Sequence, residues 1–293
     1  MGSPSTSDAF TKAKEAVIQT PSSVPHGQTL AISDGREIHY HEAGQGPAVV
    51  FVHGSGPGGS GWSNFQGNYE NLAQAGFRCL VPDLLGYGYS SKPDDAEYTL
   101  NYLTQGVLEF VDRLGLDRFS LIGNSLGGAI CIRLAVDHPE RVDQMVLMAP
   151  GGLESRDVYM GMKGIRSMLR AIFDPGGITL ESMGKVFAKQ LYDPSIISDA
   201  LLEQRMRIAQ TQPQSVFSTS RVPNQSEDLE KIRCPVLGLW GEDDQFCPIS
   251  GAATLEQHIK NVRVTRFSNC GHWVMVEHEA VFNRMVRDFL LEG

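Results

Sequence analysis

Cysteine is scarce in this sequence, and its placement argues against the two structural roles that cysteines most often have. The 293 residues hold five cysteines, at positions 79, 131, 234, 247 and 270. Their number is odd, and no two of them have the Cys-x-x-Cys spacing. We therefore expect neither a disulfide framework nor a zinc site. Five reduced thiols are typical of a cytoplasmic protein, and that is the location we expect.

Positive charge and long apolar runs are also lacking. The chain has 25 Lys and Arg against 34 Asp and Glu, a formal net charge of −9, which disfavours nucleic acid and anionic membranes as partners. The most apolar run, around residues 48–52, is far shorter than the roughly 18 residues of a membrane span. We expect no targeting segment, because the Ser-rich residues 1–9 have no apolar stretch behind them.

An alternation of strand and helix patterns is present instead. Because strands that alternate with helices form βαβ units, the pattern predicts an α/β fold with a mostly parallel sheet covered by helices. Strands are predicted at 29–32, 36–42, 48–53, 79–82, 119–123, 142–149, 235–240 and 262–267, and helices at 100–114, 126–138, 250–259 and 280–291.

The alternation stops for about seventy residues in the second half of the chain. Residues 151–223 contain Met- and Arg-rich helical stretches and no convincing strand. We interpret them as a helical cap domain inserted into a core made of residues 29–150 and 224–293, and residues 1–28 as a loosely ordered N-terminal extension. Insertions at a sheet edge tend to cover active sites.

The most informative motif is Gly-x-Ser-x-Gly at residues 123–127, directly after a predicted strand and before a predicted helix. This context is typical of a nucleophile elbow, in which a sharp turn exposes the hydroxyl of Ser125. The helix N-terminus and the N–H of Leu126 would favour an oxyanion there. The glycine-rich run His53–Gly59 also follows a strand, and its Ser55 and Gly56 N–H groups could complete an oxyanion hole.

A nucleophilic serine needs a base and an acid, and both occur at later strand ends. His272 follows the last predicted strand, whereas the acidic run 242–244 follows the strand before it. Because the carboxyl ends of parallel strands share one edge of a sheet, these side chains are expected near Ser125. The chain order Ser, Asp, His is that of α/β-hydrolases.

These stretches together resemble the α/β-hydrolase superfamily and, more narrowly, the meta-cleavage product hydrolases of bacterial aromatic degradation. Those enzymes cleave a C–C bond in 2-hydroxy-6-oxohexa-2,4-dienoates. The resemblance extends from about residue 29 to the end. It rests on HGSGPGGSGWSNF at 53–65, GNSLGG at 123–128, VLMAPGGL at 146–153, LLEQRMRIAQTQP at 201–213, WGEDDQFCP at 240–248 and CGHWVMVEHEAVFN at 270–283.

The resemblance implies a role for particular residues. Ser125 would be the nucleophile, His272 the base and Asp244, not Asp243, the acid. The residues that it implies for substrate binding are Asn64, Asn124, Arg205 and Trp273. It implies no cofactor and no metal, and a homodimer or higher homo-oligomer. The cap is where the match is loosest, so the substituent at carbon 6 of the dienoate is left open.

Arg205 also has a physical argument of its own. At helical spacing it shares an apolar stripe with Leu201, Leu202, Ile208 and Ala209. Such an arginine either extends its charged end to water or binds an anion, and a guanidinium forms a bidentate pair with a carboxylate. The cap also carries nine Lys and Arg against seven Asp and Glu, so the cationic part of an acidic chain is the part expected to cover the site.

The sequence thus leaves three hypotheses. The first is a serine-dependent hydrolase that cleaves a dienoate to a 2-hydroxypentadienoate and a carboxylic acid through an acyl-enzyme. The second is a carboxylesterase or lactonase with the same triad, which would have no need of Arg205. The third, remote because the triad is intact, is a non-catalytic ligand receptor.

Overall fold

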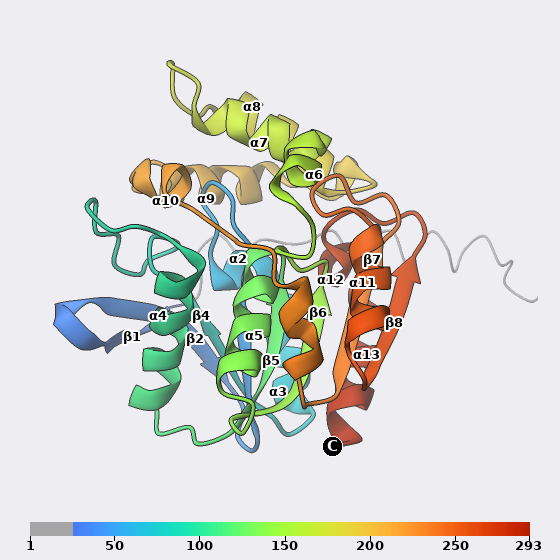
Figure 1. The fold of residues 1–293 in the computed structure, drawn as a ribbon. Coiled ribbons are helices and arrows are strands. Elements are labelled where there is room, and N and C mark those ends of the chain that lie inside the picture. Colours follow the sequence, from blue (N-terminus) through green and yellow to red (C-terminus); the bar gives the residue numbers. More distant parts are fainter. Residues whose placement is uncertain (1–25) are drawn as a thin grey trace, which may run out of the picture.

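A computed structural model describes residues 26–293, and the expectation for residues 1–25 lies outside this part of the chain. The core is one eight-stranded sheet in the order β1-β2-β4-β3-β5-β6-β7-β8 (Figure 1). The pairs β1–β2 and β2–β4 are antiparallel, and the other pairs are parallel. The strands are β1 Gln28–Ala31, β2 Glu37–Ala43, β3 Ala48–Val52, β4 Arg78–Pro82, β5 Phe119–Asn124, β6 Val142–Met148, β7 Val236–Gly241 and β8 Val262–Phe267. The prediction of an α/β fold with a mostly parallel sheet is confirmed.

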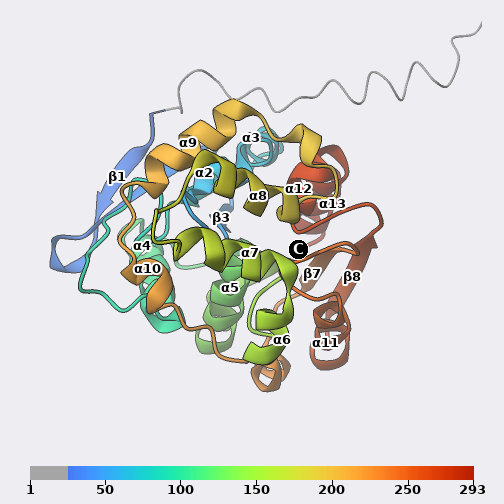
Figure 2. The same cartoon turned by 90° about the horizontal axis from the view of Figure 1, so that it is seen from above.

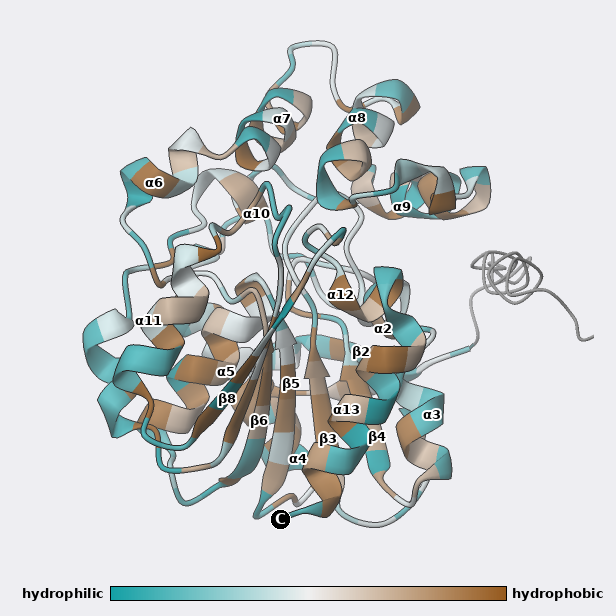
Figure 3. Cartoon of the chain, turned by 90° about the vertical axis from the view of Figure 1, so that its right-hand side faces the viewer, coloured by the Kyte–Doolittle hydropathy of each residue, from teal (hydrophilic) through white to brown (hydrophobic). Residues whose placement is uncertain are grey.

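Helices cover both faces of the sheet, and each face has its own apolar core. Successive side chains of strand β3 point to opposite faces of the sheet. Val50 and Val52 therefore belong to one core, and Val49 and Phe51 belong to the other. The hydropathy colouring shows the apolar strands enclosed between helices (Figure 3). The first core includes α4 Leu100–Arg113, α5 Leu126–Asp137 and α11 Ser250–His258, and the second includes α2 Gly61–Phe65, α3 Tyr69–Gln74, α12 Val274–Glu277 and α13 Glu279–Leu291.

Five helices lie between β6 and the return of the chain to the core. Seen from above, α7, α8 and α9 extend across the sheet edge at which the strands end (Figure 2). These helices are α6 Arg156–Gly161, α7 Lys163–Ile172, α8 Leu180–Gln190, α9 Asp199–Ala209 and α10 Ser215–Ser218. They occupy the segment in which the sequence predicts a helical cap.

The remaining elements are short, and several were not predicted. Residues 26–293 contain three 3-10 turns, η1 Ser33–Gly35, η2 Pro194–Ile196 and η3 Ser226–Lys231. Helices α2, α3 and α12 have five, six and four residues, too few to display a helical period in the sequence. In the described part of the chain, no helix has both the length and the apolar character needed to cross a membrane.

Candidate active site

Ser125 occupies a strained turn between β5 and α5. Its φ of 55° and ψ of −117° are rarely adopted by residues other than glycine, and such strain costs about 1–3 kcal/mol. Main-chain hydrogen bonds hold the turn: the Ser125 N–H donates to Met148 O over 3.0 Å, and Gly151 N–H donates to Ser125 O over 2.9 Å. A Cβ on Gly127 would overlap the carbonyl of Val52, so only glycine lets α5 pack this close to β3. The local geometry is that of the predicted elbow.

His272 and Asp244 meet at the same edge, on the loops after β8 and β7. Their Nδ1 and Oδ2 atoms are 2.7 Å apart, and both side chains are buried. The other oxygen of Asp244 accepts the N–H groups of Phe246 and Cys247 over 2.7 and 3.0 Å. A carboxylate acceptor at Nδ1 keeps the proton there, which leaves Nε2 available as a base. Asp243, by contrast, is exposed.

Ser125 and His272 line one pocket, but no hydrogen bond joins their side chains among residues 26–293. The Ser125 side chain contacts the Cys247 thiol instead. Burial and the nearby Asp244 carboxylate raise the pKa of this thiol, so it stays protonated. Hydrogen bonds between nucleophile and base are often long in unliganded enzymes and tighten when substrate binds.

The loop after β3 carries the residues predicted for the second half of an oxyanion hole. Ser55 and Gly56 line the pocket beside Ser125. Leu126 is the first residue of α5, where N–H groups have no partner within the helix. The loop lies directly against α9. A Cβ on Gly58 would overlap the carbonyl of Arg205, so only glycine fits at this position. The N–H of Gly58 also donates to Gln212 over 2.6 Å, which ties the loop to the cap.

His53 opens this loop and is fixed in its neutral form. Its Nε2 accepts the N–H of Leu84 over 3.0 Å, so Nδ1 carries the proton and donates to Gly54 O over 2.8 Å. Complete burial lowers the pKa of His53 to about 4. This histidine therefore positions the backbone of the oxyanion loop and takes no part in proton transfer near neutral pH.

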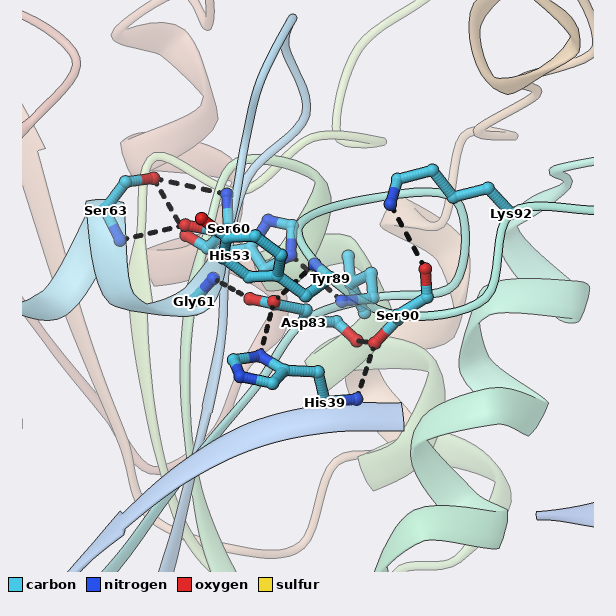
Figure 4. Close-up of polar contacts among 10 residues, drawn as sticks. His39, His53, Ser60, Gly61, Ser63, Asp83, Tyr89, Ser90 and Lys92 are labelled. Carbon is cyan, nitrogen blue, oxygen red and sulfur yellow. Dashed lines mark hydrogen bonds and ion pairs between the residues drawn. The ribbon is translucent and has the colours of Figure 1, made fainter. Parts of the chain in front are cut away.

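A buried carboxylate, Asp83, connects the elements beneath the loop (Figure 4). It accepts from the Gly61 N–H over 2.7 Å, from the Tyr89 N–H over 2.8 Å and from His39 Nδ1 over 2.8 Å. Burial by itself raises the pKa of Asp83, but the His39 hydrogen bond and the nearby donors outweigh it and hold the pKa below its usual value. The Gly61 contact fixes the start of α2, the helix that carries Ser63 and Asn64.

Arg205 projects from α9 into the same pocket and is 2% exposed. Its Nη1 donates to the Ser63 hydroxyl over 2.9 Å and to Asn64 Oδ1 over 3.5 Å. The guanidinium carbon lies 5.1 Å from the ring centre of Phe187 and 5.7 Å from that of Trp273. In the described chain, no carboxylate forms an ion pair with it, and its Nε has no partner. Burial lowers the pKa of Arg205 to about 9, so the group is charged at neutral pH.

The structure separates the four residues implied for substrate binding. Arg205 lines the pocket, whereas Asn64 and Trp273 contact Arg205 from behind it. The Trp273 indole N–H is buried and has no acceptor among the described residues. Asn124 does not line the pocket: its amide donates to the carbonyls of Met148 and His272 over 3.3 and 3.4 Å, which links the elbow to the histidine loop.

The rest of the pocket wall was not predicted from the sequence. Phe246 lines the pocket and stacks on the His272 ring with centroids 5.2 Å apart. The additional lining residues are Pro57, Ile165, Met168, Val186, Phe187, Gln190 and Phe246. Five of these project from α7 and α8 at helical spacing, which is the only sequence signal for them. Within residues 26–293, no cluster of three or more His, Cys, Asp or Glu could hold a metal.

Comparison with known proteins agrees with this architecture. The sequence model that describes the alpha/beta hydrolase family matches residues 49–284 of this chain. The chain therefore belongs to the α/β-hydrolase family.

Curated relatives narrow the family further. The chain is 36% identical to 2-hydroxy-6-oxo-6-phenylhexa-2,4-dienoate hydrolase of Burkholderia cepacia, covering 87% of this chain and 92% of that protein. It is 35% identical, with the same coverage, to the 2-hydroxy-6-oxononadienedioate/2-hydroxy-6-oxononatrienedioate hydrolase of Comamonas testosteroni. The solved structure of a meta-cleavage product hydrolase from Pseudomonas fluorescens superimposes with a TM-score of 0.81 at 28% identity, covering 91% of this chain and 98% of that one. Within the α/β-hydrolases, the chain is a member of the meta-cleavage product hydrolases.

Proposed function

We propose that this protein hydrolyses the C–C bond of a 2-hydroxy-6-oxohexa-2,4-dienoate, giving a 2-hydroxypentadienoate and a carboxylic acid. The reactions for which its relatives are named support this reaction class. The five free, buried cysteines support our placing the enzyme in the cytoplasm.

Arg205 is the observation that carries the proposal. A guanidinium buried without a carboxylate partner is costly, and an anionic substrate offsets that cost by pairing with it. The Trp273 ring packs against the guanidinium from behind and so helps to hold it toward the pocket. An esterase or lactonase acting on a neutral substrate has no use for a buried cation at this position, although it would use the same serine.

The chemistry follows from where the carboxylate docks. With the carboxylate on Arg205, the dienoate extends past Ser125, which lines the same pocket. Tautomerisation of the 2-hydroxydienoate to its keto form makes the C5–C6 bond cleavable, because the electron pair released at C5 is delocalised into the unsaturated ketone. His272 Nε2 removes the Ser125 proton, and Oγ attacks the C6 ketone.

The oxyanion formed at C6 is stabilised by the N–H of Leu126 and by the N–H groups of the Ser55–Gly56 loop. Its collapse breaks the C5–C6 bond, and the electron pair passes through the conjugated system to the C2 oxygen. The dienolate takes up the proton that His272 received from Ser125, which gives the 2-hydroxypentadienoate. The acyl group stays on Ser125. A water molecule, deprotonated by His272, then releases the carboxylic acid and regenerates the serine. One water is consumed in the cycle, and no external oxidant or cofactor takes part.

Absorbance measurements test the proposal, because these dienolates are coloured and cleavage bleaches them. We expect kcat/KM for the 6-phenyl dienoate to exceed that for a simple aryl ester. Ser125→Ala should bind the dienoate without bleaching it, with a loss of several orders of magnitude in rate. Faster turnover of the ester than of any dienoate would instead support the esterase alternative. Dienoate binding by the wild-type protein without turnover of either substrate would support a non-catalytic receptor.

A further inference from the structure

The pocket beyond Ser125 is lined by apolar side chains with one exception. Ile165 and Met168 of α7 and Val186 of α8 pack with Phe246, and together they form an apolar wall over the site. The exception is Gln190, the last residue of α8, which lines the pocket among them. This uncharged amide is carried by the cap, whereas Ser63 and Asn64, the polar partners of Arg205, are on α2 of the core.

The carboxamide of Gln190 keeps a small accessible surface in the pocket and has no hydrogen-bond partner in the described chain. The residue is 6% exposed, and its side chain forms no hydrogen bond within residues 26–293. Its main chain, by contrast, is fixed: Gln190 O accepts the N–H of His272 over 2.7 Å. Two residues after Gln190, the Tyr192 N–H donates to the Glu277 carboxylate over 2.6 Å. That carboxylate also accepts the N–H of Gly271 over 2.7 Å, so the segment after α8 is tied to the histidine loop.

An amide in this position costs free energy unless something in the pocket hydrogen-bonds to it. Hydrophobic residues of similar volume would fill the same space without that cost. We propose that Gln190 is a specificity residue, which binds an uncharged oxygen, a hydroxyl or a carbonyl, on the group attached to carbon 6 of the substrate. The inference rests on the proposed function and names the substrate class within it: 6-aryl or 6-alkyl dienoates that carry such an oxygen.

The same wall disfavours a second carboxylate at the far end of the substrate. Arg205 is the only Lys or Arg among the lining residues, and the dienoate carboxylate occupies it. A second carboxylate would lose its hydration beside Val186 and Phe246 without a counter-charge. The relatives include hydrolases named for a 6-phenyl dienoate and hydrolases named for dienedioates. Our proposal separates this chain from the dienedioate group.

Wild-type kinetics give the first test. The substrates are dienoates that differ only in the group at carbon 6. This group is phenyl, one of the three hydroxyphenyl isomers, or 2-carboxyethyl. We expect at least one hydroxyphenyl isomer to exceed 6-phenyl about tenfold in kcat/KM, and the carboxyethyl compound to be the poorest. Equal values for phenyl and all hydroxyphenyl compounds, or a preference for carboxyethyl, would overturn the inference. The proposed function fails separately, if no dienoate is hydrolysed.

Substitution gives the second test. Gln190→Met keeps the volume and removes the amide, so the ratio of kcat/KM for the preferred hydroxyphenyl compound to that for the 6-phenyl compound should fall to about one. Gln190→Glu keeps an acceptor, so it should retain part of the preference and reject the carboxyethyl compound further. Exposed Gln210 on the same cap provides the control Gln210→Met, which should change nothing. A hydroxyphenyl preference that survives Gln190→Met, or an equal loss of rate on every substrate, would contradict a role of Gln190 in recognising the substituent at carbon 6.

Discussion

The guanidinium of Arg205 donates to the hydroxyl of Ser63 over 2.9 Å. Ser63 in turn donates to Ser60 O over 3.1 Å, so its oxygen is held with its lone pairs toward the arginine. Ser60 caps α2, and the next residue, Gly61, is bound by the buried Asp83 (Figure 4). The position of the cation therefore depends on the core of the hydrolase fold as well as on the cap helix that carries it.

Ser63→Ala should weaken dienoate binding without disturbing the chemistry at Ser125. Removing the hydroxyl leaves a buried guanidinium with one hydrogen bond fewer, so we expect KM for the dienoate to rise about tenfold and kcat for a neutral ester to stay the same. Steady-state kinetics on both substrates measure the difference. Ser182→Ala, which removes a similar capping hydroxyl in α8 far from the arginine, is the control. An equal effect of the two substitutions would show that Ser63 only stabilises its helix.

The affinity for carboxylates should fall at alkaline pH. Burial lowers the pKa of Arg205 to about 9, so the folded protein loses this positive charge as the pH rises through 9. Below that pH the charge is present and binding is strong, and above it we expect Ki to rise by up to tenfold per pH unit. The saturated analogue 6-oxo-6-phenylhexanoate is suitable, because its carboxylate stays ionised over this pH range and it has no enol that could titrate. A Ki that stays constant to pH 10, or that rises equally for an uncharged phenyl ketone, would contradict this assignment.

Two neighbouring aspartates allow a matched test of the acid. Asp244 holds His272 Nδ1 at 2.7 Å, whereas Asp243 is exposed. Asp244→Asn replaces the acceptor by an amide that can favour the wrong tautomer, and we expect kcat to fall by about 10⁴-fold. Asp243→Asn should stay within about twofold of the wild type. Both rates come from the same bleaching assay, and a large loss in Asp243→Asn alone would assign the acid to the other residue.

Sequence reasoning predicted the parts of this site that follow from strand ends and helix period. Ser125, Asp244 and His272 each follow a strand of a parallel sheet, and this is enough to bring them to one edge. Arg205 was found because it interrupts an apolar helical stripe, and the structure buries it with Leu201 and Ile208. The choice of Asp244 within the acidic run 242–244, and of anion binding as the role of Arg205, came from the family resemblance, because the local pattern left both open.

The parts that were not predicted depend on how separate segments pack. His53 is neutral because its Nε2 meets the N–H of Leu84, thirty-one residues later. Gln190 lines the pocket because the end of α8 meets the histidine loop, where Gln190 O accepts the N–H of His272. Asn124 follows the expected strand and precedes the nucleophile, but its amide points to the main chain of Met148 and His272 and not into the pocket. No period or spacing in the sequence encodes these orientations.

The central claim is that a buried arginine selects anionic dienoates for a serine hydrolase. It is tested most directly by comparing Arg205→Ala with Arg207→Ala, since Arg207 lies on the exposed side of the same helix. The measurement is kcat/KM for the 6-phenyl dienoate and for a neutral aryl ester in each variant. We predict a loss of at least 100-fold on the dienoate, about 3 kcal/mol, with less than a few-fold loss on the ester, and only for Arg205→Ala. Equal losses on both substrates in Arg205→Ala would contradict the account.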